Sequence, residues 1–151
     1  MNHLICFGNE LHGDDGFGPA VYRRLSALGA PRGWRFFAAG SRGIDALGLF
    51  ENCLQTIIVD AAAPAGHPGR LIQLLGVDIN RELAVDGHAA GVGFLLSALT
   101  AIGSRQNPRI LAAEMSALIT FHIGLSAPVE AAVDEAIPLL HKWMGSMRGQ
   151  E

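Results

Sequence analysis

Cysteine is scarce in this 151-residue sequence, which contains only Cys6 and Cys53. Both lie in apolar surroundings, in the stretches LICF and ENCLQ. They form neither a Cys-x-x-Cys pair nor the spacing of a zinc ribbon. We therefore expect two buried, reduced thiols in a cytoplasmic protein.

Positive charge is also sparse. Lys and Arg together number 11 against 14 Asp and Glu, which gives a formal net charge of -3. The basic residues are scattered and form no stripe that would attract phosphate groups, so nucleic acid is not expected as a partner.

Targeting signals and membrane spans are not evident either. The N-terminus MNHLICFGNE has neither the basic region nor the small-residue cleavage site of a signal peptide. Residues 87–104 carry no formal charge, but they include His88, Ser97, Thr100 and several glycines. A membrane span needs about 20 mainly apolar residues. We expect a helix buried in a protein core here, and no membrane partner.

What the sequence does contain is a high apolar fraction, 50% hydrophobic against 17% charged residues, which fits one domain over residues 1–151. Apolar runs predict strands at 3–7, 34–39, 54–61, 70–75 and 109–115. Helical spacing predicts helices at 20–28, 43–51, 88–102 and 127–143, with Pro138 kinking or splitting the last one. This alternation predicts an α/β fold of three layers, a mostly parallel twisted sheet of about five strands with helices on both faces.

The stretch GNELHGDDGFGPAV, residues 8–21, gathers acidic side chains in a glycine-rich loop directly after the first predicted strand. Glu10 lies in this loop, Asp60 ends the strongest apolar run, and His88 stands where a loop meets a helix. Ligands of such sheets bind beyond the carboxyl ends of the strands, where these three residues can converge. Two carboxylates and one imidazole suit a borderline divalent ion such as zinc or nickel, and three protein ligands leave positions open for water or substrate.

The other polar residues of this loop can have structural roles or no specific role. Asp14 or Asp15 can cap the following helix by accepting its backbone N–H groups. His12 can face a substrate or simply be solvated. A phosphate-binding loop is disfavoured, because the stretch matches neither glycine-rich phosphate motif and its carboxylates would repel a polyphosphate.

The stretch GNELHGDDGFG resembles the N-terminal signature of the hydrogenase maturation endopeptidases, a G-N-x-L-x-G-D-D-G-x-G pattern after the first strand. The resemblance continues in order along nearly the whole chain. It includes the strand and turn IIVDAAAPAGHPGRL, the histidine-bearing segment GHAAGVGFLL, and the helix start GLSAPVEAAVDEAI, in which Ala127 intervenes between Ser and Pro.

This resemblance implies an aspartyl-type endopeptidase that removes a C-terminal extension from the large-subunit precursor of a nickel-iron hydrogenase after nickel insertion. The metal-contacting positions map to Glu10, Asp60 and His88, which would also be the catalytic set. The nickel would be carried by the substrate, zinc or cadmium could replace it in crystals, and no organic cofactor is implied. Hydrolysis would use a metal-polarised carbonyl or a metal-activated water, with Asp14 and Asp15 as candidate proton acceptors. Cys6 and Ser41 are poor candidates for a nucleophile.

The sequence departs from the family pattern at two places. It reads Ala38-Ala39-Gly40-Ser41 where many members carry Asp-Gly-Gly-Thr, and Asp86-Gly87 precede the histidine where a hydroxyl residue is frequent. A nickel-sensing assembly factor that binds the precursor without cutting it is therefore an alternative. A self-contained metal hydrolase for a small substrate is another.

Overall fold

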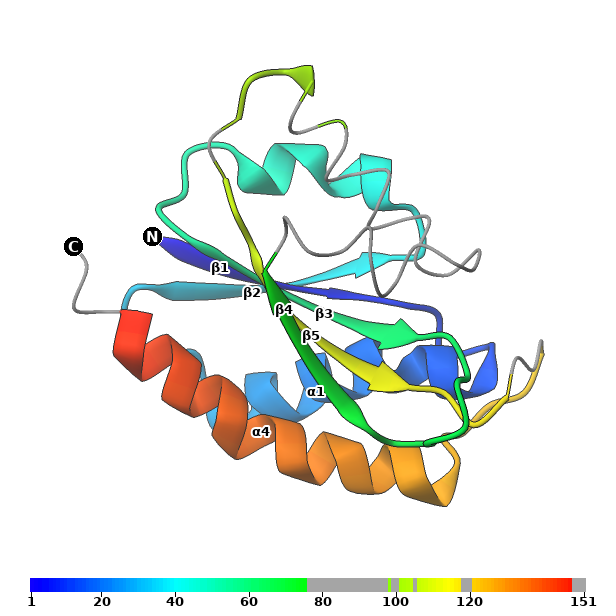
Figure 1. Ribbon diagram of the computed structural model, residues 1–151. Helices are drawn as coiled ribbons and strands as arrows, with labels where there is room; N and C mark the ends of the chain where they lie inside the picture. Colours follow the sequence, from blue (N-terminus) through cyan, green and yellow to red (C-terminus); the bar gives the residue numbers. More distant parts are fainter. Residues whose placement is uncertain (76–97, 99–100, 105, 118–120, 148–151) are drawn as a thin grey trace.

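The computed structural model describes residues 1–75, 98, 101–104, 106–117 and 121–147 (Figure 1). Five strands form one sheet: β1 (Asn2–Phe7), β2 (Trp34–Gly40), β3 (Thr56–Ala62), β4 (Leu71–Leu75) and β5 (Arg109–Glu114). The helices are α1 (Phe17–Leu28), α4 (Ala127–Met147) and two 3-10 helices, η1 (Gly13–Gly16) and η2 (Gly43–Phe50).

The sheet has the order β2-β1-β3-β5-β4. β1 pairs in parallel with β2 and β3, and β3 pairs in parallel with β5. β4 pairs with β5 in the antiparallel sense. Because four strands run in the same direction, their carboxyl ends lie at one edge of the sheet, which we call the carboxyl edge.

Helices cover both faces of the sheet. α1 and α4 lie together on one face, where they pack on alternate strand residues such as Leu4, Val59 and Leu111. η2 lies on the opposite face, in cyan in Figure 1, where Ala46 and Phe50 pack near Ile5, Ile58 and Ile110. The alternation of neighbouring residues between the faces is the two-residue period of a strand. The prediction of a three-layer α/β fold with a mostly parallel sheet is thus confirmed.

Of the two effects expected of Pro138, a kink or a split, the split does not occur, because α4 continues through Pro138 as one element. Its buried stripe includes Val129, Val133, Ile137 and Leu140 on both sides of the proline. This packing outweighs the loss of one backbone hydrogen bond within the helix.

The second predicted helix, 43–51, is the 3-10 helix η2. Most of the predicted helix at 88–102 lies outside the described residues. No helix in the described part of the chain is long and apolar enough to cross a membrane.

Candidate active site at the carboxyl edge of the sheet

Asp60 lies in β3, near the carboxyl edge, and only 7% of its surface is exposed. One carboxylate oxygen accepts the backbone N–H of Ala61 at 2.8 Å. Burial raises the pKa of Asp60 well above its ordinary value; the Ala61 hydrogen bond opposes this rise, and the charge of Asp15 adds to it. A carboxyl group in this environment favours a proton or a cation as its counterpart.

Asp15 is the carboxylate whose charge acts on Asp60. It lies in η1, directly beyond β1, and is 4% exposed. Its Oδ2 accepts the backbone N–H of Asn9 at 2.9 Å. The glycine-rich loop thus carries an acid whose charge acts on the carboxyl group near the end of β3.

Asp14 has a different environment, although it is adjacent in sequence. Its oxygens accept the backbone N–H and the hydroxyl of Ser116, at 2.9 and 2.7 Å, and those of Ser126, at 2.7 and 2.9 Å. Burial alone would raise the pKa of Asp14, but these hydrogen bonds outweigh it and hold the pKa below its ordinary value. Asp14 therefore joins η1 to both ends of the segment between β5 and α4.

Neither Asp14 nor Asp15 occupies an N-cap position. The N-cap of α1 is Gly16 and that of η1 is His12, and neither N-cap residue makes a side-chain capping hydrogen bond, while Asp14 and Asp15 lie in the first turn of η1.

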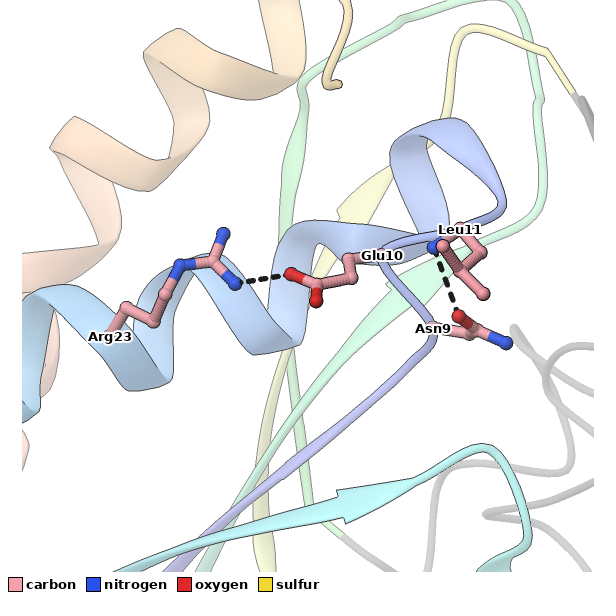
Figure 2. A network of polar contacts seen from close by, with 4 residues as sticks. All are labelled: Asn9, Glu10, Leu11 and Arg23. Carbon is pink, nitrogen blue, oxygen red and sulfur yellow. Dashed lines mark hydrogen bonds and ion pairs between the residues drawn. The ribbon is translucent and has the colours of Figure 1, made fainter. Parts of the chain in front are cut away.

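Glu10 lies at the surface of the same loop. Its side chain is 59% exposed and its Oε2 is 2.6 Å from Nη1 of Arg23, which projects from α1 and is 60% exposed. Figure 2 shows the Glu10 carboxylate directed along α1 toward the guanidinium group. The same view shows the neighbouring turn, in which Asn9 Oδ1 accepts the backbone N–H of Leu11 at 2.9 Å.

A cavity of about 460 Å³ adjoins this ion pair at the ends of β1 and β2. Its lining includes Glu10, Arg23, Tyr22, Ala38 and Ser41. Ala38, at the position where the resemblance implies an acid, thus lies in the wall of the cavity. Cys6 also lines the cavity, but burial and then the charge of Asp60 raise the pKa of its thiol, which disfavours the nucleophilic thiolate.

His88, the third predicted metal contact, lies outside the described residues. Within the described ranges no three His, Cys, Asp or Glu side chains are grouped as a metal site. Two buried carboxyl groups, those of Asp15 and Asp60, lie close enough for the charge of Asp15 to raise the pKa of Asp60.

Glu114 is a buried acid that the sequence reasoning missed. It ends β5, is 0% exposed, and forms an ion pair with Arg70 at 3.2 Å. Its other oxygen accepts the backbone N–H groups of Ala65 and His67. Glu114 therefore fixes the turn that follows Asp60. The signal was present in RILAAEM, where an acid ends an apolar run as Asp60 does.

A larger cavity of about 830 Å³ lies at the opposite edge, around the first residues of β3 and β5. The described residues that line it include Gln55, Gln73, Gln106 and Asn107, with no Asp, Glu or His among them. The larger cavity therefore lacks side chains that could act as a general acid or base, and the carboxyl edge is the stronger candidate for an active site.

Known proteins resemble this chain in sequence and in architecture. Residues 19–143 match the family model described as hydrogenase maturation protease. The chain is 26% identical over 147 residues to the hydrogenase 3 maturation protease of Escherichia coli K12, covering 95% of this chain and 90% of the relative.

Two solved structures show the same fold. The [NiFe] hydrogenase maturation protease HybD from Thermococcus kodakarensis aligns with a TM-score of 0.77 and 23% identity, over 94% of this chain and 97% of that one. The hydrogenase 2 maturation peptidase of a Thaumarchaeota archaeon aligns with a TM-score of 0.71 and 27% identity, over 95% and 97%. The resemblance to this family is thereby confirmed, and this chain belongs to the hydrogenase maturation protease family, a family of peptidases.

Proposed function

We propose that this chain is an endopeptidase that removes the C-terminal extension of a nickel-iron hydrogenase large-subunit precursor after nickel insertion. The observation that carries the proposal is the position of Asp60, a carboxyl group only 7% exposed near the end of β3, in a chain that belongs to the hydrogenase maturation protease family. Buried acids whose pKa values are perturbed cluster at functional sites.

Nickel held by the precursor would be recognised through the carboxylates at the carboxyl edge together with His88. Glu10, Asp60 and His88 are the contacts that the resemblance implies. Asp15 is favoured as the partner of Asp60 because it is buried and its charge raises the pKa of Asp60, whereas Glu10 is exposed and paired with Arg23. We therefore extend the proposed set to Asp15, with Glu10 at its rim.

The catalytic roles follow from the same environments. Metal contact would place the scissile peptide bond beside Asp15 and Asp60 and polarise its carbonyl group. Asp14 is a poor candidate to accept a proton from the attacking water, because its oxygens already accept four hydrogen bonds. Asp15 is the other candidate. The lowered pKa of Asp14 also makes it a weak base.

The test is mass spectrometry of the precursor after incubation with the purified chain, with and without nickel in the precursor. We expect C-terminal shortening only of the nickel-loaded form, and loss of shortening in Asp60→Ala and His88→Ala. Asp134→Ala, which removes an exposed acid of α4, is the matched control. Unaltered cleavage by Asp60→Ala would count against the site.

Two further variants assign the remaining metal contact. Loss of cleavage in Asp15→Ala with retention in Glu10→Ala would assign the contact to Asp15, and the opposite result would assign it to Glu10. Binding of the precursor by the wild-type chain without any change in its mass would favour the non-cleaving assembly factor. Tight retention of metal by the isolated chain would favour a self-contained metal hydrolase.

A further inference from the structure

Three exposed apolar side chains lie beside the candidate site. Phe121 is 88% exposed, Ile123 is 78% exposed and Leu11 is 49% exposed. The first two are the most exposed of the large apolar side chains in the described part of the chain. We call Leu11, Phe121 and Ile123 the apolar patch. Exposed apolar surface of this kind marks sites of contact with other molecules.

The apolar patch is held in a defined shape. His12 and His122 form a parallel bridge, in which His122 N–H donates to the Leu11 carbonyl at 2.9 Å and Gly13 N–H donates to the His122 carbonyl at 2.6 Å. Phe121 N–H donates to Nδ1 of His12 at 3.3 Å, and the two rings meet edge to face at 5.5 Å. The segment that carries Phe121 is also fixed near both ends, through Ser116 and Ser126, by Asp14.

The backbone at Phe121 is strained. Its φ of 55° lies in the left-handed region, which bulky side chains rarely adopt. Burial does not account for this conformation, because the side chain is almost fully exposed. Residues with strained backbone conformations cluster at active sites and ligand-binding sites.

The apolar patch is continuous with the acids of the site. Leu11 directly follows Glu10, and the His12 carbonyl accepts the backbone N–H of Asp15 at 3.2 Å. The apolar patch and Asp15 thus belong to connected parts of the same loop, next to which a macromolecule with its peptide bond at these acids would lie.

We propose that the apolar patch is the docking surface for the hydrogenase precursor protein, and that it takes apolar side chains of the precursor near the bond to be cut. The inference rests on the proposed function and adds to it the place where the protein substrate is held. The apolar patch would act in binding, while the acids act on the reacting bond.

The test is a comparison of KM and kcat for the nickel-loaded precursor between the wild-type chain and Phe121→Asn. Asparagine removes the apolar ring but tolerates a positive φ, so the variant should fold with an unchanged or higher Tm. We expect KM to rise about tenfold or more, as fits the loss of one buried aromatic contact, with kcat near the wild-type value. Ile123→Ser should act in the same direction, and Leu28→Ser, which removes a 64% exposed leucine at the end of α1, should leave both constants unchanged.

An unchanged KM in both patch variants, with a wild-type chain that cleaves, would overturn this inference and leave the proposed function intact. Molar mass measured by light scattering gives a second outcome. A wild-type dimer that Phe121→Asn converts to a monomer would show that the patch serves a second copy of this chain, which would also overturn the proposal. A wild-type chain that neither binds nor cleaves the precursor would overturn the proposed function and this inference together.

Discussion

Asp14 of η1 and Ser126, 112 residues further along the chain, are joined by two hydrogen bonds, from the serine N–H at 2.7 Å and from its hydroxyl at 2.9 Å. A second pair of bonds connects the same carboxylate to Ser116. One buried side chain thus positions the loop after β1 against the segment that leads into α4. The role of Asp14 is accordingly to support the site.

Replacement of Asp14 by asparagine should destabilise the protein. The amide group places two donors against the donors of Ser116 and Ser126, so buried hydrogen-bonding groups are left without acceptors. We expect Asp14→Asn to lower the free energy of unfolding by about 2–3 kcal/mol, measured by urea denaturation at pH 7. Asp134→Asn, which breaks an exposed ion pair with Arg24, should change it by less than about 1 kcal/mol.

The difference between wild type and Asp14→Asn should depend on pH. The pKa of Asp14 is lowered in the folded protein. The contribution of its carboxylate to the free energy of unfolding is therefore complete above the unfolded pKa of about 4, and it is lost as pH falls through the folded pKa. A difference that stays constant down to pH 2 would contradict the assigned role of the ionised carboxylate.

Replacement of Asp60 by asparagine should have the opposite effect on stability. The folded pKa of Asp60 is raised, so ionisation of this group opposes folding as pH rises above about 4. We expect Asp60→Asn to raise the free energy of unfolding of the metal-free protein by about 1–3 kcal/mol at pH 7, while precursor cleavage is lost. The gain should disappear below about pH 4, and a stability loss at pH 7 would contradict the environment described for Asp60.

The contact between α1 and β1 depends on Gly18. A Cβ atom at this position would lie 1.9 Å from the carbonyl oxygen of Phe7, which belongs to the backbone and cannot move aside. Gly18→Ala should therefore lower the free energy of unfolding by about 3 kcal/mol, measured by thermal or urea denaturation. Gly145→Ala in α4 meets open space and should raise it by about 0.5–1 kcal/mol.

Glu114 should be a further determinant of stability. Replacement by glutamine removes the charge that pairs with Arg70. If the one amide oxygen accepts the N–H groups of Ala65 and His67, the amide NH2 group is left facing the guanidinium group. We expect Glu114→Gln to lower the free energy of unfolding by about 3 kcal/mol. Glu135→Gln on the exposed side of α4 is the control and should be neutral within about 0.5 kcal/mol.

Most of the fold followed from local sequence signals. The uninterrupted β-branched run before Asp60 predicts a central strand, and β3 is buried along its whole length. The direction of β4 could not be predicted, because the apolar content of residues 71–75 is the same for either orientation of the strand. The local rule that proline interrupts helices did not predict that α4 continues through Pro138. The helix is stabilised by apolar residues buried on both sides of the proline, and a local rule does not include this packing.

The candidate site was less predictable than the fold. Asp60 could be selected because a carboxylate at the end of an apolar run needs a partner. The choice among Glu10, Asp14 and Asp15 could not be made from spacing, because the 3-10 turn of η1 decides which side chain faces the sheet. Glu10 is exposed and pairs with Arg23. Asp14 accepts hydrogen bonds from Ser116 and Ser126. Of the three, only Asp15 has a charge that acts on Asp60.

The antiparallel pairing of β4 has a consequence for the connection between β4 and β5. Leu75, the last residue of β4, pairs with Arg109, the first residue of β5, so the chain leaves the sheet and re-enters it at the same place. Both residues line the larger cavity, so the connection between the two strands begins and ends at the edge of the sheet opposite Asp60.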